Sequence, residues 1–135
     1  MEGGSEKKKT YSIPVGGSNG IGTWGYIEAV KELILQWEGG ERSEADAQSE
    51  KIDHIVFATG SGGTSTGIVL GIALAYEFKQ EPVPKMHAIG VCDDPDYFYG
   101  MMASIAGEMG FAHPSGISAK DFIMKHVTVY QGKGL

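Results

Sequence analysis

The sequence predicts an α/β protein built in three layers, with a mostly parallel sheet and flanking helices. Two observations carry this prediction. Short apolar runs alternate along the chain with segments of helical periodicity, and each of two glycine-rich turns stands between an extended run and a helix. Strands separated by helices form parallel βαβ crossovers, which build layered α/β sheets.

Length and composition limit the possible classes of protein. The 135 residues fit one domain with a core of its own. There are 17 Asp and Glu residues against 11 Lys and Arg residues, and this net charge of −6 argues against nucleic-acid binding. The single cysteine excludes an internal disulfide framework and fits a reducing compartment. Since no run approaches the roughly 18 apolar residues of a membrane span and the N-terminus is polar, we expect a cytoplasmic protein.

Shifts in composition along the chain indicate its domain organisation. Residues 1–10 form a polar, lysine-bearing segment, which we expect to be a disordered leader. Residues 11–135 form one α/β domain. Within it, residues 38–50 are acidic and lack a sustained apolar periodicity, so we expect an exposed loop there.

The stretch around which the chain is organised is residues 58–67, Ala-Thr-Gly-Ser-Gly-Gly-Thr-Ser-Thr-Gly. It follows an apolar run at 52–57, predicted to be a buried strand. It opens an apolar segment, Ile68 to Tyr76, predicted to be a helix. In such a turn, glycines let the backbone approach a ligand, and the first N–H groups of the helix point at it. The sequence therefore predicts an anion site, to which the hydroxyls of Thr59, Ser61 and Thr64 can add donors.

The spacing of this turn leaves an alternative open. From Gly60 it reads Gly-x-Gly-Gly-x-x-x-Gly, which is neither a P-loop nor a clean Gly-x-Gly-x-x-Gly. The glycines can instead serve only tight packing of the helix on the sheet, as a stripe of small residues at helical spacing. The members of that stripe are Gly63, Gly67, Gly71 and Ala75.

A second unit of extended piece, turn and helix precedes this one. Pro14 blocks a helix and favours extended angles over residues 11–15. A glycine-rich turn follows at 16–22, and then a helix in which apolar residues recur at steps of three and four. These residues are Ile27, Val30, Ile34 and Trp37. Within the turn, Gly16 to Asn19 is either a plain loop or one wall of a ligand site.

A buried parallel strand is predicted at 86–92. Three acids in four positions follow it, Asp93, Asp94 and Asp96. They can indicate a metal site, but no second cluster of ligands accompanies them. The favoured interpretation is that Asp94 or Asp96 caps a helix that begins near Pro95.

The last part of the chain contains a loop at 110–118, a short helix at 118–125 with Ser118 as its N-cap, and a strand at 126–130. Four histidines are scattered over the sequence without a zinc-binding spacing, and we expect them to be structural. They are His54, His87, His113 and His126.

Four segments, taken together, resemble one known family. They are Ile13-Pro14-Val15-Gly16-Gly17-Ser18-Asn19, Gly22-Thr23-Trp24-Gly25-Tyr26, Thr59-Gly60-Ser61-Gly62-Gly63-Thr64 and Gly90-Val91-Cys92-Asp93-Asp94-Pro95. In order and spacing they resemble the D-cysteine desulfhydrase and 1-aminocyclopropane-1-carboxylate (ACC) deaminase family of pyridoxal-phosphate enzymes, which has the tryptophan synthase β-like fold. The resemblance runs from about Tyr11 to Leu135, and residues 38–50 look like an insertion.

The resemblance implies pyridoxal 5'-phosphate as the cofactor. The loop that holds the cofactor phosphate is then Thr59, Gly60, Ser61, Gly62, Gly63 and Thr64. The wall of the cleft near the cofactor ring is Gly16, Gly17, Ser18 and Asn19. The implied substrate is a small amino acid: D-cysteine, which yields pyruvate, ammonia and hydrogen sulfide, or ACC, which yields 2-oxobutanoate and ammonia. The resemblance also implies a homo-oligomer for the full-length enzyme.

The sequence departs from the family in one respect. The Schiff-base lysine of the family lies in an asparagine-lysine motif upstream of the matching segment, and that motif is absent here. Lys7, Lys8 and Lys9 lack its context, so we assign no catalytic residue, and no metal ligand either. We therefore expect a middle fragment of such an enzyme.

Two other functions remain open. One is a catalytically inactive phosphate- or cofactor-binding module that partners a full-length paralogue. The other is a Rossmann-like nucleotide-binding unit. Against the latter, Asp93 lies roughly 30 residues past Gly63, further than the usual interval of about 20 to a ribose-binding acid.

Overall fold

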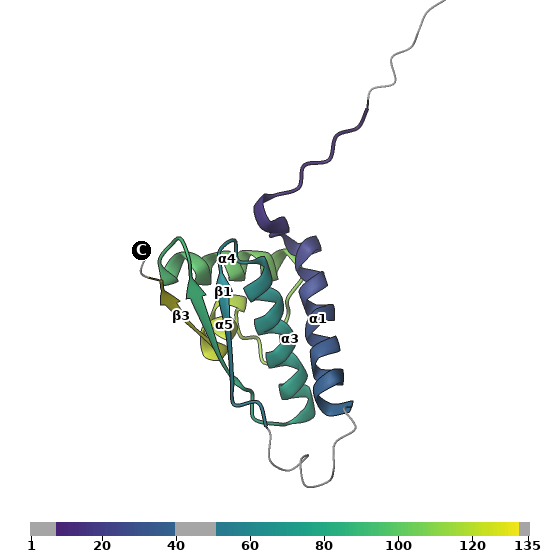
Figure 1. Cartoon of the computed structure of the whole chain (residues 1–135), viewed down its shortest axis with the longest axis vertical. Coiled ribbons are helices and arrows are strands. Elements are labelled where there is room, and N and C mark those ends of the chain that lie inside the picture. The colour runs from purple at the N-terminus through teal and green to yellow at the C-terminus, as the bar shows by residue number, and fades with distance from the viewer. Residues whose placement is uncertain (1–7, 40–50, 133–135) are drawn as a thin grey trace, which may run out of the picture.

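The computed structural model describes residues 8–39 and 51–132, which form a parallel sheet with helices packed against it (Figure 1). In chain order the elements are the short 3-10 helix η1 (Val15–Gly17), α1 (Gly20–Gly39), β1 (His54–Thr59), α3 (Gly63–Lys79), β2 (Lys85–Gly90), α4 (Pro95–Glu108), α5 (Ala119–His126) and β3 (Val127–Gln131). The expected leader, residues 1–10, and loop, residues 38–50, lie mostly outside the described residues. No helix in the described ranges is long and apolar enough to cross a membrane.

The sheet has the strand order β1-β2-β3, and both neighbouring pairs are parallel. The register sets Ile55 opposite Met86, and Met86 opposite Val127. Each strand is separated from the next by at least one helix, as parallel connections require. The predicted α/β class, with a parallel sheet and flanking helices, is confirmed.

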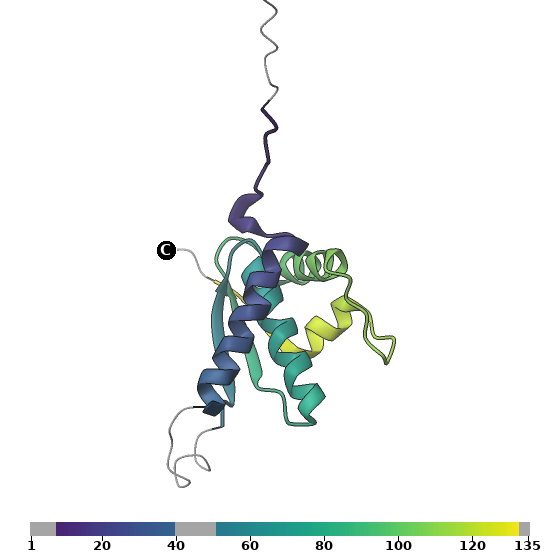
Figure 2. The same ribbon diagram turned by 90° about the vertical axis from the view of Figure 1, so that its right-hand side faces the viewer.

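The two faces of the sheet differ in burial. On one face Met86 and Ala88 are buried against the helices, while on the other Val56 is 66% exposed. The strands expected to be buried on both sides therefore alternate between buried and exposed positions. The described helices cover one face (Figure 2), so the expected third layer is not formed by the described residues.

The core lies between the covered face of the sheet and α3, α4 and α5. Its largest fully buried side chains include Phe98 of α4, Phe122 of α5 and Ile72 of α3. Apolar residues from α1, α3, α4 and α5 join one cluster with the sheet, as burial of a single contiguous core requires.

Helix α1 packs on α3, and the small-residue stripe of α3 makes this possible. A Cβ atom added at Gly67 would overlap Tyr26, and one at Gly71 would lie 3.0 Å from the Cβ of Val30. In the alternative left open by the sequence, the stripe served packing of the helix on the sheet, but Gly67 and Gly71 face α1. The apolar face predicted for α1 lies toward the core: Val30 is buried, Ile27 and Ile34 pack against the core, and Trp37 is half-buried.

The helix starts follow the predicted capping signals. The Asp94 carboxylate accepts a hydrogen bond of 2.9 Å from Tyr97 N, with Pro95 as the first residue of α4. The Ser118 hydroxyl accepts a bond of 3.1 Å from Asp121 N at the start of α5. Both caps satisfy backbone donors that the first helical turn leaves free. Of the residues the structure describes, no group of three His, Cys, Asp or Glu side chains could hold a metal ion.

Several boundaries differ from the sequence-based expectation: β1, predicted at 52–57, is His54–Thr59, and β2, predicted at 86–92, is Lys85–Gly90. The extended piece expected at 11–15 ends at Pro14, whose backbone is extended, because η1 begins at Val15. Helix α1 continues through Gly39, two residues into the segment expected to be a loop, whose remainder lies outside the described residues.

Candidate functional site

The glycine-rich turn joins the carboxyl end of β1 to the start of α3. Gly62 adopts a left-handed conformation with φ of 89°, which residues with a side chain rarely adopt. The Thr59 hydroxyl is buried and lies 2.7 Å from the Ser65 hydroxyl, which donates to Gly62 O. These contacts hold the turn over the end of β1. The Thr59 hydroxyl is therefore already bonded within the turn.

The N-terminus of α3 is open to an acceptor. Gly62, at its N-cap position, supplies no side-chain cap, and the first turn carries no acidic residue. The N–H of Gly63 donates to the Ser18 hydroxyl, while the N–H groups of Thr64 and Ser65 meet no acceptor among the described residues. Unpaired N–H groups and the positive end of the helix dipole together favour an anion at this point.

The two glycine-rich turns are in direct contact, although they lie 43 residues apart at Ser18 and Ser61. The Ser18 hydroxyl donates to Ser61 Oγ over 2.6 Å and accepts from Gly63 N over 3.1 Å. A Cβ atom at Gly16 would overlap the Ser61 hydroxyl, and one at Gly63 would lie 2.7 Å from Ser18 Oγ. Glycine at these two positions is what allows the turns to meet.

The first turn has its own backbone requirements. Gly16 and Gly17 have φ values of 68° and 62°, in the left-handed region. The Asn19 side-chain oxygen accepts from Gly22 N over 2.8 Å, so this side chain caps the start of α1. Ser18 is the residue of this turn whose side chain contacts the turn at 60–63.

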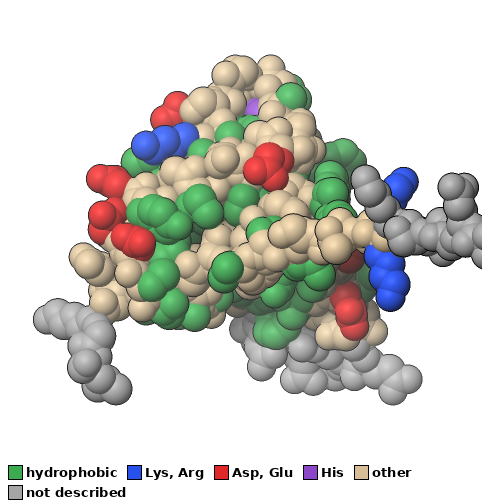
Figure 3. Space-filling model, turned by 90° about the horizontal axis from the view of Figure 1, so that it is seen from above, with side chains coloured by type: hydrophobic (Ala, Val, Ile, Leu, Met, Phe, Trp, Pro, Cys, Tyr) green, Lys and Arg blue, Asp and Glu red, His purple; other side chains and the backbone are tan. Residues whose placement is uncertain are grey.

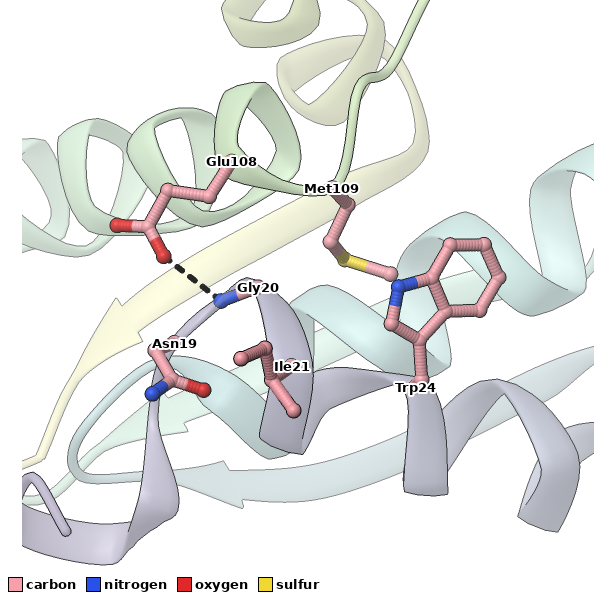
Figure 4. A pocket seen from close by; sticks show the side chains of 6 residues that line it. All are labelled: Asn19, Gly20, Ile21, Trp24, Glu108 and Met109. Atoms are coloured by element: carbon pink, nitrogen blue, oxygen red, sulfur yellow. Dashed lines mark hydrogen bonds between the residues drawn. The ribbon is translucent and has the colours of Figure 1, made fainter. Parts of the chain in front are cut away.

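A carboxylate from α4 also reaches the start of α1. The Gly20 N–H donates to Glu108 Oε2 over 2.7 Å. Next to this bond is a cavity of about 200 Å³ between the two helices (Figure 4), lined by Asn19, Gly20, Ile21, Trp24, Glu108 and Met109. Glu108 was not predicted to be near the turns, because its contact spans 88 residues of sequence.

Cys92 is a further neighbour that sequence reasoning did not assign. Its thiol donates to Gly60 O over 3.3 Å, and the adjacent Val91 N donates to Thr59 O over 3.0 Å. The signal was its position just past β2, since carboxyl ends of neighbouring parallel strands lie at the same sheet edge. These bonds hold the glycine-rich turn on that edge.

The molecule is seen from above in Figure 3, where hydrophobic side chains, uncharged polar groups and backbone cover most of the surface, acidic groups gather at the left edge and a few basic side chains lie at the left and right. No lysine among the described residues forms a hydrogen bond with either turn. Attraction of an anion therefore depends on backbone N–H groups and hydroxyls.

The histidines, expected to be scattered, form two groups. His54 Nδ1 lies 2.8 Å from His87 Nε2 on the exposed face of the sheet. The other ring nitrogen of His87, Nδ1, lies within hydrogen-bonding distance of the Tyr130 hydroxyl. His113 and His126 both contact Glu77. All four have partners among the described residues, and their structural role stays a prediction.

The fold and the turn define the chain as a parallel α/β protein with a strand, glycine-rich turn and helix unit. Comparison with known proteins is more specific, although no protein-family model matches. Over 129 residues the chain is 43% identical to the mitochondrial bifunctional D-cysteine desulfhydrase/1-aminocyclopropane-1-carboxylate deaminase of Arabidopsis thaliana. It is 34% identical over 131 residues to a predicted 1-aminocyclopropane-1-carboxylate deaminase of Thermotoga maritima. It is 35% identical over 83 residues to a D-cysteine desulfhydrase of Klebsiella pneumoniae.

The first two matches each include 96% of this chain. Nearly the whole length of the chain is therefore homologous to enzymes of the D-cysteine desulfhydrase/ACC deaminase family, and it corresponds to one part of their longer sequences. It spans 28% of the Arabidopsis relative, 36% of the Thermotoga relative and, through the shorter match, 20% of the Klebsiella relative.

Proposed function

We propose that this chain supplies the phosphate-binding part of a pyridoxal 5'-phosphate site in an enzyme of the D-cysteine desulfhydrase or ACC deaminase type. The observation that carries the proposal is the N-terminus of α3 directly after the left-handed Gly62, where the N–H groups of Thr64 and Ser65 meet no acceptor in the described part of the chain. The homology supports pyridoxal phosphate as the ligand of this anion site, because enzymes of the homologous family use that cofactor.

The donor set of the site fits a phosphate group. The backbone N–H groups of Thr64 and Ser65 are without an acceptor in the described part of the chain, and the Ser61 and Thr64 side chains are half-buried at the turn. Each hydrogen bond to a charged oxygen contributes about 1.5–3 kcal/mol. A few such bonds account for binding without a side-chain cation.

The other predicted residues take different roles in this proposal. Gly60, Gly62 and Gly63 allow the backbone conformation of the turn. The hydrogen bond between the Thr59 and Ser65 hydroxyls stabilises that conformation. Gly16, Gly17 and Asn19 hold Ser18 against the turn and extend the wall of the site toward α1.

When bound, pyridoxal phosphate supplies an electron sink for bonds at the α-carbon of an amino acid. D-Cysteine and ACC are the two substrates to which the names of the relatives point. The residues described here bind and orient the phosphate end. The expectation of a cytoplasmic address stays a prediction, and the name of the Arabidopsis relative places that protein in mitochondria.

One observation favours a second candidate function. Because no described lysine forms a hydrogen bond with either turn, the chain is also suited to a non-catalytic module that retains affinity for phosphate or cofactor. Such a module would act as a partner of a full-length paralogue.

The experiment that tests the proposed site compares two glycine variants. Gly62 and Gly116 both have positive φ, 89° and 75°, so Gly62→Val and Gly116→Val place similar strain on the backbone. Gly116 lies in the loop before α5, away from the turn. Calorimetry with pyridoxal phosphate and with inorganic phosphate should show binding to the native chain and to Gly116→Val, and none to Gly62→Val. Circular dichroism checks that both variants are folded.

Unchanged affinity in a folded Gly62→Val variant would place the site elsewhere. A native chain that binds neither ligand would refute the proposal.

A further inference from the structure

We propose that Ser18 is a positioning residue that makes the Ser61 hydroxyl a directed donor to a phosphate dianion. This inference rests on the proposed function, because it concerns the same site. It adds a specific role for the first glycine-rich turn, which contacts the second through a side chain and not only through packing.

The first link is the bond from Gly63 N to Ser18 Oγ, 3.1 Å long. A backbone N–H can only donate, so Ser18 is the acceptor in this bond. The donor belongs to the first residue of α3, where the helix dipole is positive. The bond therefore polarises the Ser18 hydroxyl and makes its proton a better donor.

The second link is the bond from Ser18 Oγ to Ser61 Oγ, 2.6 Å long. Ser18 uses its one proton here, so Ser61 accepts and keeps its own proton for another partner. Hydrogen bonds in a chain strengthen one another, so the terminal Ser61 O–H is a stronger donor than an isolated serine.

The glycines beside the two serines show that the bond between Ser18 and Ser61 depends on close approach of the two turns. At both Gly16 and Gly63, an added Cβ atom would collide with one of the two serine side chains. Both serines are half-buried, which limits competition from water for the bond between them. The pair therefore has a defined geometry before any ligand arrives.

The chemistry of this chain selects a class of ligand. A hydroxyl that accepts one bond and offers one proton matches an oxygen that has no proton of its own. Since the second pKa of a phosphate monoester is about 6, the dianion, in which every terminal oxygen is such an acceptor, is the prevailing form at neutral pH. Ser18 acts on this ligand through Ser61, without touching it.

A double-mutant cycle tests the inference. Binding of pyridoxal phosphate and of inorganic phosphate is measured by calorimetry at pH 7.5 for the native chain, Ser18→Ala, Ser61→Ala and the double variant. We expect Ser61→Ala to weaken binding about tenfold, the value of one bond to a charged group. Ser18→Ala should weaken binding about fivefold in the native background and hardly at all in the Ser61→Ala background.

A purely structural role for Ser18 predicts a different result, in which Ser18→Ala weakens binding by the same factor in both backgrounds. That result would overturn the inference. Ser61→Ala with unchanged affinity would also overturn it, and this outcome can be read even if Ser18→Ala fails to fold.

The outcomes also separate the inference from the proposed function. If the native chain binds phosphate and Gly62→Val does not, while the serine effects are additive, only the role of Ser18 is wrong. If the native chain binds neither probe, both fail together.

Discussion

His126 Nε2 lies 3.1 Å from Glu77 Oε1, so the last turn of α5 is bound to the last helical turns of α3. Lys125 Nζ lies 3.2 Å from the same oxygen, and His113 Nε2 lies 3.1 Å from Oε2. One carboxylate thus joins α3, α5 and the loop between α4 and α5. These contacts lie at the opposite end of α3 from the glycine-rich turn.

This cluster predicts that the chain loses stability on acidification in two stages. Burial lowers the pKa of His126, and the Lys125 charge lowers it further, against the opposing effect of Glu77. Since the unfolded chain protonates His126 near pH 6.5 and the folded chain does so lower, the free energy of unfolding falls as the pH drops below about 6.5.

The second stage comes from Glu77. Burial raises its pKa, but hydrogen bonds from Lys125 and His113 and the charges of Lys125 and His126 outweigh burial and lower the pKa overall. The stability that Glu77 contributes is present above the ordinary value of about 4.3 and is lost as the pH falls through the lowered folded value. Urea denaturation between pH 8 and pH 3 measures both stages. Glu77→Gln should remove the lower stage, and a native profile without any decline would contradict the assignment.

The contact between α1 and α3 predicts a penalty for one small substitution. Gly67→Ala adds a Cβ atom that collides with Tyr26 and comes within 3.0 Å of Thr23 O, so we expect a net loss of about 1–3 kcal/mol. Gly25→Ala on α1 is the matched control, because open space surrounds that position. It should stabilise the chain by about 0.5–1 kcal/mol through helix propensity. Equal thermal stability of the two variants would show that α1 is not packed on α3 in this way.

The exposed face of the sheet predicts self-association of the isolated chain. Val56 is 66% exposed there, and Ile89 is 37% exposed. Parallel sheets are normally covered on both faces, so this surface favours contact with another apolar surface. Ile89→Lys should shift sedimentation velocity profiles toward the monomer. Ser104→Lys, which adds the same charge at an exposed position of α4, should not. A monomeric native chain at high concentration would refute the expectation.

The lysine content predicts that the isolated chain does not turn over substrate. A covalent link to the cofactor aldehyde needs a lysine amine with a lowered pKa and a fixed position, and Lys7, Lys8 and Lys9 have no sequence context for either. Incubation with pyridoxal phosphate and D-cysteine or ACC should release no keto acid above a cofactor-only control. Borohydride should trap no specific lysine. Turnover above the control that disappears when all three lysines are replaced would show that the leader supplies the amine.

Local features of this protein could be predicted from the sequence. The starts of α4 and α5 follow from Asp94 with Pro95 and from Ser118, because a cap involves residues only three positions apart. The path of the central turn follows from Gly62, whose left-handed φ needs a glycine. The parallel order of strands and helices follows from periodicity and from short connections.

The tertiary structure alone decided the contacts between distant segments. The Ser18 and Ser61 bond, the Glu108 bond to Gly20 and the Glu77 cluster each join residues at least 36 positions apart. The turning of the glycine stripe toward α1, and the exposure of one sheet face, depend likewise on which elements pack together. Sequence periodicity shows which side of an element is apolar, but it does not show which other element covers that side.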